Sequence, residues 1–327
     1  MDIIISENID GPGISELEKK YDVLRDGSLW KEKAKLLDCL PNARAIIVRN
    51  QTQFDKELID AAKQLLIIGR AGVGYDNIDV RAASEHGVVV SFTPHENAIS
   101  TAEHAFALIL GLYRKLPAAH LSTSQGKWDR YSLIGHELYG KTIGILGFGK
   151  IGARLAVRAR AFGMKIVAYD KFLAPLDFTV TETGAELRDL DYVLSHADIV
   201  SCHLPMGRET TGIINYDRLK MMKPEAILIN TARGELIVEA DLVRALKEHL
   251  IAGAGLDVRQ KEPPPESELN HMDNVLLTPH VAGLTVEAQK KVVDTVAADV
   301  ARVLGGGAAV NYVNFPVPRT GEKNGAN

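Results

Sequence analysis

Arg233, Glu262 and His280 each come at or just after the end of a short apolar run in the sequence. A guanidinium can bind a carboxylate through two hydrogen bonds, and a carboxylate beside an imidazole can orient it for proton transfer. Arg233 lies between Ala232 and Gly234, whose small side chains leave room for a ligand. Each residue alone has an ordinary alternative: a surface cation, a solvated loop charge or a structural histidine. Together they predict a site that binds an anion and moves a proton.

Gly147, Gly149 and Gly152 have the spacing G-x-G-x-x-G, directly after an apolar run and at the start of a helical pattern. In dinucleotide-binding turns, the first glycine allows a tight turn, the second lets a pyrophosphate approach and the third lets helix and strand pack closely. The helix N-terminus then faces the phosphates. Asp170 closes the next apolar run, about 20 residues on, where a carboxylate binds ribose hydroxyls and repels a 2′-phosphate. The pattern predicts NAD in preference to NADP; a glycine-rich turn without a ligand is the alternative.

Short apolar runs alternate with helical patterns along the chain, which is typical of α/β proteins with parallel sheets. The first series of expected strands covers 2–6, 21–25, 43–48, 64–69 and 87–92. The second series covers 141–147, 165–170, 198–204, 226–231, 251–258 and 274–280. Its runs are almost continuously apolar, as in strands covered on both faces. Because parallel strands end at one edge of a sheet, we expect Arg233, Glu262 and His280 to meet there.

Two long helical patterns, 99–116 and 285–304, bracket the second series of strands. Ser100 or Thr101 should cap the first of them, and Pro117 should end it. Because both patterns are long enough to cross from one domain to another, they indicate that the second series forms an inserted domain.

The chain has 327 residues, which exceeds the usual size of a single core and predicts two domains. We expect two doubly wound parallel-sheet α/β domains. Residues 1–97 and 288–327 should form a discontinuous, flavodoxin-like substrate domain, and residues 98–287 an inserted Rossmann NAD-binding domain. The polar tail at 316–327 should be disordered.

The composition is ordinary for a soluble globular protein, with 46% hydrophobic and 24% charged residues and a net charge of −4. This charge argues against nucleic acid or an anionic membrane as a partner, and no apolar run is long enough to span a membrane. Cys39 and Cys202 both lie in apolar stretches, so we expect free thiols and a reducing, cytoplasmic location. No metal site is expected.

The chain resembles the D-isomer-specific 2-hydroxyacid dehydrogenases, a family that includes D-3-phosphoglycerate dehydrogenases and glyoxylate/hydroxypyruvate reductases. The matching stretches are GRAGVGYDNID (69–79), NAISTAEHAFALILGLYR (97–114), GKWDR (126–130), GKTIGILGFGKIG (140–152), INTARGELI (229–237), AGLDV (254–258), EPPP (262–265) and NVLLTPHVAG (274–283). They cover nearly the whole chain in the family's order. The resemblance is therefore specific, and it implies an oxidoreductase that uses NAD.

The resemblance also assigns residues to roles. Its catalytic residues fall on Arg233, Glu262 and His280. Its cofactor contacts fall on Gly147, Gly149, Lys150, Ile151, Gly152, Asp170, Leu204, Pro205, Thr231, Asp257 and Gly283. Its substrate contacts fall on Arg49, Asn50, Arg70, Gly72, Val73, Gly74 and Asn97, together with Arg233 and His280.

The chain departs from the family in three respects, one of which is His136 in the loop SLIGHEL, where a small or hydroxyl residue is expected. Arg259 stands where the family commonly has an aromatic residue. The longer phosphoglycerate dehydrogenases carry C-terminal regulatory domains, and we expect a short form without one.

In this interpretation, Arg233 binds the carboxylate of a 2-keto acid and polarises its keto oxygen. His280 donates a proton to that oxygen as hydride arrives from NADH, and acts as the base in the oxidation. Glu262 binds the other ring nitrogen, fixes the tautomer and favours the protonated imidazole. The substrate is a small 2-hydroxy or 2-keto acid.

Arg49 suggests that the substrate carries a second anionic group, and His136 and Arg130 add further positive or titratable groups. This favours 3-phosphoglycerate/phosphohydroxypyruvate or 3-sulfolactate/sulfopyruvate. The alternative is that Arg49 is a surface residue and the chain is a hydroxypyruvate/glyoxylate reductase.

Two other classes of protein compete with a 2-hydroxyacid dehydrogenase. An NAD(H)-sensing, corepressor-like scaffold stays open because such relatives keep the same three residues. A formate dehydrogenase is disfavoured because those enzymes have glutamine in the role of Glu262. Relatives are usually homodimers or homotetramers built through the NAD-binding domain, here through 99–116 and 120–138 with Trp128 and Tyr131.

Overall fold

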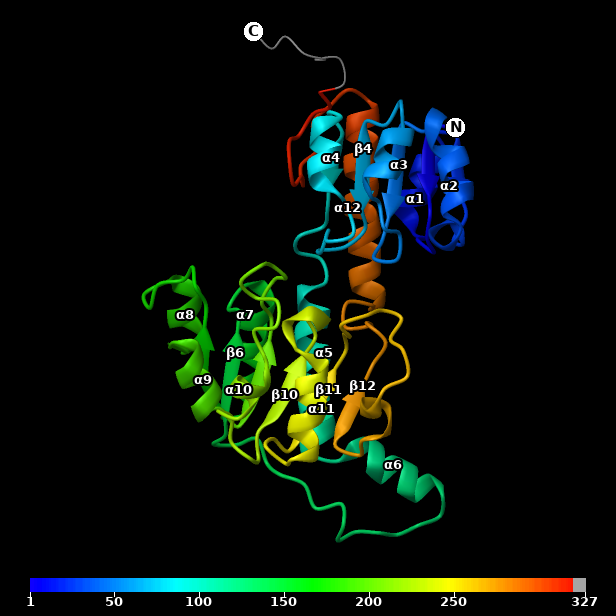
Figure 1. Ribbon diagram of the computed structural model, residues 1–327. Helices are drawn as coiled ribbons and strands as arrows, with labels where there is room; N and C mark the ends of the chain where they lie inside the picture. Colours follow the sequence, from blue (N-terminus) through cyan, green and yellow to red (C-terminus); the bar gives the residue numbers. More distant parts are fainter. Residues whose placement is uncertain (320–327) are drawn as a thin grey trace. The chain divides into compact units, whose positions relative to one another are not determined.

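The computed structural model describes residues 1–319, so the expectation for the tail beyond Arg319 lies outside the described residues. The chain forms two compact units, Met1–Asn97 with Leu284–Asn327 and Ala98–Gly283 (Figure 1). We expected the inserted domain to end at residue 287, but the second unit ends at Gly283. Thr285 caps the long helix that follows, and that helix packs into the first unit, so the chain changes unit before it.

The first unit is built on a five-stranded parallel sheet with the order β2-β1-β3-β4-β5. Its strands are β1 (Ile3–Ile5), β2 (Val23–Arg25), β3 (Ala45–Val48), β4 (Ile67–Arg70) and β5 (Val89–Ser91). This order is that of the flavodoxin-like sheet. All strands except the edge strand β2 are fully buried, which explains their uninterrupted apolar sequences.

Helices cover both faces of this sheet. They are α1 (Pro12–Glu18), α2 (Lys33–Cys39), α3 (Lys56–Ala61), α4 (Val80–Glu85) and α12 (Val286–Leu304), with short 3₁₀ turns at Leu29–Lys31 and Leu40–Asn42. Ile3 and Ile5 pack with α1 and α12 on one face, whereas Ile4 packs with α2, α3 and α4 on the other. The alternation of side chains along a strand therefore separates the core into two layers.

The second unit contains a seven-stranded parallel sheet with the order β12-β11-β10-β9-β6-β7-β8. Its strands are β6 (Thr142–Leu146), β7 (Lys165–Tyr169), β8 (Glu186–Leu187), β9 (Ile199–Cys202), β10 (Ile227–Asn230), β11 (Gly253–Leu256) and β12 (Val275–Leu277). The order reverses at β6, which pairs with both β7 and β9. This is the Rossmann switch point, where ligands bind at the carboxyl ends of the strands.

The helices of the second unit are α5 (Ala98–Tyr113), α6 (Leu116–Ser124), α7 (Lys150–Ala161), α8 (Phe178–Thr183), α9 (Leu190–His196), α10 (Tyr216–Leu219) and α11 (Glu239–Lys247), with 3₁₀ turns at Gly234–Leu236 and Glu268–His271. All but one of these helices cover the two faces of the sheet; α6 is the exception. Residues of α5 and α7 share one core, and residues of α9, α10 and α11 share the other. None of the helices in residues 1–319 is long and apolar enough to cross a membrane.

The expected helix at 99–116 was wrong at both ends. The helix α5 begins at Ala98, so Ser100 and Thr101 lie buried inside it and are not its cap. It ends at Tyr113, and Lys115 has a left-handed φ of 51°. Pro117 lies in the first turn of α6, where a proline needs no N–H partner, and so it starts a new helix instead of ending the old one.

Candidate active site

Arg233, Glu262 and His280 follow three neighbouring strands of the second unit. Arg233 comes after β10, Glu262 after β11 and His280 after β12, and these strands pair in that order. All three strands are parallel, so their carboxyl ends lie at the same edge of the sheet. The convergence expected from the sequence is therefore present within a single unit.

His280 and Glu262 form a hydrogen-bonded pair. The ring Nδ1–H of His280 donates to Oε2 of Glu262 across 2.6 Å, and Oε1 of Glu262 accepts the backbone N–H of Arg259 at 3.1 Å. Both side chains are about one third exposed. With Nδ1 engaged, Nε2 is the ring atom of His280 that can exchange a proton with a ligand.

The backbone at His280 has a left-handed conformation with a φ of 54°. For a residue with a side chain this conformation is strained, and it persists only where the surroundings impose it. Here the N–H of His280 donates to the carbonyl of Asp257 at 2.7 Å, while its ring is bound to Glu262. Hydrogen bonds from both its backbone and its side chain thus hold His280 in this conformation.

Asp257 is the anchor of the turn that carries His280. Its carboxylate accepts the N–H groups of Val281 at 2.9 Å and Ala282 at 2.8 Å, and the hydroxyl of Thr278 at 2.6 Å. His104 of α5 lies 3.4 Å from the same carboxylate. Burial raises the pKa of Asp257, but His104, Thr278 and the two N–H groups outweigh it and lower that pKa to about 2.

Arg233 is half-buried on a turn that Asn230 closes. The side-chain amide of Asn230 donates to the carbonyl of Arg233 at 2.8 Å and accepts the N–H of Ala232 at 3.0 Å. Gly234 lies against the backbone of Arg259, because a Cβ at this position would come within 2.0 Å of its carbonyl carbon. Gly234 is therefore required because the backbone of Arg259 leaves no room for a side chain. The sequence analysis explained it differently, as leaving room for a ligand.

The three glycines of the G-x-G-x-x-G turn have different surroundings. Gly147 has a φ of 93°, and a Cβ there would lie 2.7 Å from the backbone of His203. A Cβ at Gly152 would lie 2.3 Å from the carbonyl oxygen of Gly147. At Gly149, by contrast, a Cβ would meet no described atom within 4 Å. Two glycines thus serve the tight strand–helix turn, and the middle one faces open space that can admit a pyrophosphate.

Unpartnered polar atoms lie at the carboxyl ends of the strands next to this turn, after β9 and β10. Oγ1 of Thr231 and Nδ1 of His203 are buried and have no hydrogen-bond partner in the part of the chain that the structure describes. Burial lowers the pKa of His203 to about 4, so its ring is neutral near pH 7. Gly149, the N-cap of α7, has no side chain to cap the first N–H groups of that helix. Buried polar atoms normally find partners, so these residues fit a bound dinucleotide.

Asp170 lies at the end of β7, next to the glycine turn. Its carboxylate accepts the N–H of Phe148 and that of Phe172, each at 2.9 Å. These two bonds orient the side chain and leave further acceptor positions on both oxygens. The arrangement fits the ribose-binding role that the sequence predicts.

The remaining predicted cofactor contacts lie at the same edge of the sheet. Lys150 and Ile151 begin α7, Leu204 and Pro205 follow β9, and Gly283 ends the turn after β12. Among residues 1–319, no three His, Cys, Asp or Glu side chains lie together in a way that could hold a metal ion.

The predicted substrate residues of the first unit lie beyond the carboxyl ends of its strands. Arg49 and Asn50 follow β3, Arg70 ends β4 and is followed by Gly72, Val73 and Gly74, and Asn97 comes between β5 and α5. The guanidinium of Arg70 lies against Gly72, where a Cβ would come within 1.7 Å of Nη1. Arg49 donates to the side chain of Gln289 on α12. Burial lowers the pKa of Arg49, and the carboxylate of Glu7 opposes that shift.

Glu7 organises the Arg49 loop and was missed by the sequence analysis. It is 4% exposed, and its carboxylate accepts the N–H groups of Arg49 at 2.7 Å, Gln51 at 3.2 Å and Thr52 at 2.9 Å. The side chain of Asn77 donates to the carbonyls of Arg49 and Thr52, both at 2.7 Å. Neither Glu7 nor His104, which contacts Asp257, lies in a sequence pattern that marks it as a site residue. Glu7 does, however, follow a strand in the same way as the predicted site residues.

Replacing Asp257 with Asn should remove stability that depends on its ionised form. Because the folded-state pKa of Asp257 is lowered to about 2, ionisation contributes about 2 kcal/mol above pH 4, and this contribution is lost as the pH falls from about 4 to about 2. The variant should therefore unfold at a lower urea concentration at neutral pH, and the difference from wild type should shrink in acid.

Urea unfolding followed by circular dichroism at several pH values checks this expectation. Asp191→Asn, an exposed substitution in the first turn of α9, is the control. A stability difference that stays constant from neutral to acid pH would contradict the role given to the Asp257 carboxylate.

Known proteins resemble this chain over most of its length. The family model "D-isomer specific 2-hydroxyacid dehydrogenase, NAD binding domain" matches residues 106–282. A D-3-phosphoglycerate dehydrogenase of Synechocystis is 43% identical over 314 residues, which are 96% of this chain and 56% of that protein. A glyoxylate reductase of Pyrococcus furiosus is 40% identical and covers 90% of each chain. The structure of an Aquifex aeolicus D-lactate dehydrogenase complexed with NAD and lactic acid has a TM-score of 0.85 at 28% identity, covering 97% of this chain and 100% of that one.

The chain thus spans a little more than half the length of the curated phosphoglycerate dehydrogenase that it matches. The family model covers the unit that contains the glycine turn, Arg233, Glu262 and His280. The order of strands, the residues at the strand ends and the extent of the matches all indicate the same family. This chain belongs to the D-isomer-specific 2-hydroxyacid dehydrogenase family, and its second unit contains the NAD-binding domain of that family.

Proposed function

We propose that this chain is an NAD-dependent D-2-hydroxyacid dehydrogenase that interconverts a small 2-hydroxy acid and the corresponding 2-keto acid. The observation that carries the proposal is the 2.6 Å bond between His280 and Glu262, at the edge of the sheet where Arg233 also lies. A carboxylate–imidazole pair beside a fixed guanidinium suits a substrate that carries a carboxylate next to an oxygen that gains or loses a proton.

Three residues of this chain have separate roles in the proposed reaction. Arg233 binds the substrate carboxylate and polarises the keto oxygen. His280 donates a proton from Nε2 to that oxygen in the reduction, and accepts it in the oxidation. Glu262 holds Nδ1, which fixes the ring orientation and stabilises the charged imidazole. NAD(H), when bound, supplies or accepts the hydride.

The preference for NAD over NADP rests on Asp170. Its carboxylate is held by the N–H groups of Phe148 and Phe172, so it cannot turn away from the end of β7 without losing both bonds. A fixed negative charge there accepts bonds from ribose hydroxyls and repels a 2′-phosphate. The buried hydroxyl of Thr231 and the ring of His203 are further groups of this chain that would hold the dinucleotide.

We further propose that the substrate carries a second anionic group and that Arg49 binds it. The guanidinium of Arg49 is half-buried, its side-chain partner Gln289 is neutral, and within residues 1–319 no carboxylate forms an ion pair with it. The nearby carboxylate of Glu7 is occupied by backbone N–H groups. A half-buried cation without a direct ion-pair partner among residues 1–319 favours phosphohydroxypyruvate/3-phosphoglycerate or sulfopyruvate/3-sulfolactate.

Two alternatives follow from other observations. The Pyrococcus relative is a glyoxylate reductase and matches the chain over 90% of both lengths, which supports a hydroxypyruvate/glyoxylate reductase as the second candidate. A scaffold that senses NAD(H) would keep the same residues but would not turn over any 2-keto acid. The free thiols of Cys39 and Cys202 support a reducing, cytoplasmic location for any of these functions.

We propose that the chain forms a homodimer or homotetramer through its NAD-binding domain. The helix α6 has no buried residue, and it extends with the segment after it away from the sheet of its unit (Figure 1). Leu121, Trp128, Tyr131 and Tyr139 are all more than half exposed there. Apolar surface of this extent is typical of a protein interface, and a second copy of the chain is the occupant we expect. His136, which packs on Tyr113, lies in the same segment.

The function is tested by following NADH absorbance with phosphohydroxypyruvate, sulfopyruvate, hydroxypyruvate and glyoxylate, and by repeating the best reaction with NADPH. We expect kcat/KM to be at least about tenfold higher for one of the dianionic acids and for NADH. Arg49→Met should then raise KM for that acid much more than for glyoxylate. Equal effects on both acids would exclude a second-anion role for Arg49, and NADH binding without turnover would favour the scaffold.

Glu262→Gln should lower kcat/KM for reduction about a hundredfold while NADH binding stays unchanged, because an amide stabilises the charged imidazole poorly. Glu266→Gln is the matched control, since Glu266 bonds to the exposed His271 at 2.7 Å in the same loop. If both variants behaved alike, Glu262 would have no specific part in proton transfer.

Replacing both Trp128 and Tyr131 with Asp should convert the assembly to monomers, because burying two carboxylates in an apolar interface is unfavourable. Light scattering coupled to size-exclusion chromatography measures the mass directly. Phe172→Asp, at another largely exposed aromatic residue of the same unit, is the control. A wild-type chain that is already monomeric at micromolar concentration would rule out the proposed interface.

A further inference from the structure

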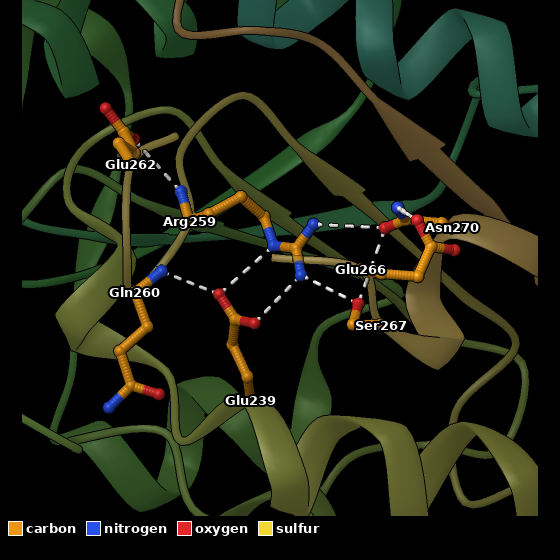
Figure 2. A network of polar contacts seen from close by, with 7 residues as sticks. All are labelled: Glu239, Arg259, Gln260, Glu262, Glu266, Ser267 and Asn270. Atoms are coloured by element: carbon orange, nitrogen blue, oxygen red, sulfur yellow. Dashed lines mark hydrogen bonds and ion pairs between the residues drawn. The ribbon is translucent and has the colours of Figure 1, made fainter. Parts of the chain in front are cut away.

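Arg259, the residue that departs from the family pattern, forms an ion pair in which its own side chain is buried and the side chain of Glu239 is partly exposed. Its side chain is only 7% exposed and binds the carboxylate of Glu239 with two bonds, from Nε at 3.1 Å and from Nη2 at 2.9 Å. Nη2 also donates to the hydroxyl of Ser267 at 2.9 Å, and Nη1 lies 3.5 Å from Oδ1 of Asn270 (Figure 2). The guanidinium therefore connects α11 with the far end of the loop that contains Glu262.

Glu239 holds the backbone of this loop as well as the side chain of Arg259. Its Oε1 accepts the N–H of Gln260 at 2.6 Å (Figure 2). Burial raises the pKa of Glu239, but Arg259 and the N–H of Gln260 outweigh it and keep that pKa below its ordinary value. Glu239 is the first residue of α11, where the helix dipole also favours a negative charge. The carboxylate of Glu239 is therefore ionised at neutral pH.

The same segment touches the groups that carry the proposed chemistry. The backbone N–H of Arg259 donates to Oε1 of Glu262, whose Oε2 binds His280. The backbone of Arg259 also packs against Gly234, the residue after Arg233. A shift of Arg259 would move the donor that orients Glu262 and the surface that supports the Arg233 turn.

An apolar side chain at residue 259 could fill space but could not make these directional contacts. A buried ion pair pays a desolvation penalty, and well-packed apolar residues are often at least as stabilising. The pair is thus poorly explained by stability alone. Its two-pronged geometry restricts the position of the backbone between Arg259 and Glu262, as a planar guanidinium bound to a carboxylate does.

We propose that the Glu239–Arg259 ion pair positions Glu262 against His280, so that Glu239 and Arg259 are positioning residues for proton transfer. The inference rests on the proposed function, because it assigns the effect to the catalytic step. It predicts that loosening the pair lowers kcat while ligand binding is preserved.

The test compares Arg259→Met, Arg259→Lys, Glu239→Gln and the double variant Glu239→Gln/Arg259→Met with wild type. We expect Arg259→Met and Glu239→Gln to lower kcat about tenfold to a hundredfold, with KM and the Kd of NADH changed less than about twofold. Arg259→Lys, which keeps one ion pair, should recover part of the loss. The double variant should be no slower than the worse single variant, because both changes break one interaction.

Arg244→Met and Glu248→Gln are the matched controls. These residues form an ion pair at the other end of the same helix, with a distance of 2.9 Å and both side chains exposed. Both control variants should keep the wild-type kcat. If they lost as much kcat as the Glu239 and Arg259 variants, the effect would belong to α11 in general and the proposal would be overturned.

A second readout does not depend on turnover. The Nδ1–H proton of His280, donated to a carboxylate, should give a downfield proton resonance that is assigned by its absence in Glu262→Gln. We expect this resonance to be lost or exchange-broadened in Arg259→Met and Glu239→Gln, and retained in the controls. If wild type reduces no 2-keto acid yet the resonance behaves in this way, the positioning role stands and the proposed function fails.

Two further outcomes overturn the inference. In the first, Arg259→Met and Glu239→Gln keep both the wild-type kcat and the resonance. In the second, NADH affinity and thermal stability fall together with kcat in every variant, including Arg259→Lys and Glu239→Gln. The second outcome would mean that the pair only holds the fold. If Arg259→Met alone fails to fold, the two conservative variants decide between these results.

Discussion

The site depends on one electrostatic constraint, the buried carboxylate of Asp257. At 1% exposure its charge must be compensated, and the backbone N–H groups of Val281 and Ala282 compensate it. The turn after β12 is thereby tied to the end of β11. This tie, together with the bond from the N–H of His280 to the carbonyl of Asp257, holds a left-handed backbone in place. The direction of the imidazole follows from that backbone and from Glu262.

The same hydrogen-bonding arrangement occurs in both units. A carboxylate at the end of one strand accepts N–H groups from the loop that follows the neighbouring strand. Asp257 does so between β11 and β12, Asp170 between β7 and β6, and Glu7 between β1 and β3. Because the loops that follow neighbouring parallel strands lie side by side, one carboxylate can hold the adjacent loop. Each of these carboxylates lies next to residues that we expect to contact cofactor or substrate.

The strands could be predicted because fully buried parallel strands have continuous apolar sequences, and the glycine turn because its backbone tolerates no side chain at Gly147 or Gly152. The prediction failed where the local signal was weak or ambiguous. The strand β8 has only two residues, too few to show a pattern. The break between α5 and α6 occurs at Lys115, and no glycine at that position marks it in the sequence. Pro117 is compatible with either the end or the start of a helix.

The sequence by itself determined the order of strands and helices, the glycine turn, and the residue types at the strand ends, because these depend on neighbours along the chain. Only the tertiary structure decided which other charged groups meet. Glu239 and Arg259 are 20 residues apart, and Glu7 and Arg49 are 42 apart. No local pattern encodes such pairs, since they form only when the sheet brings the ends of different strands, and the loops and helices that follow them, to one edge.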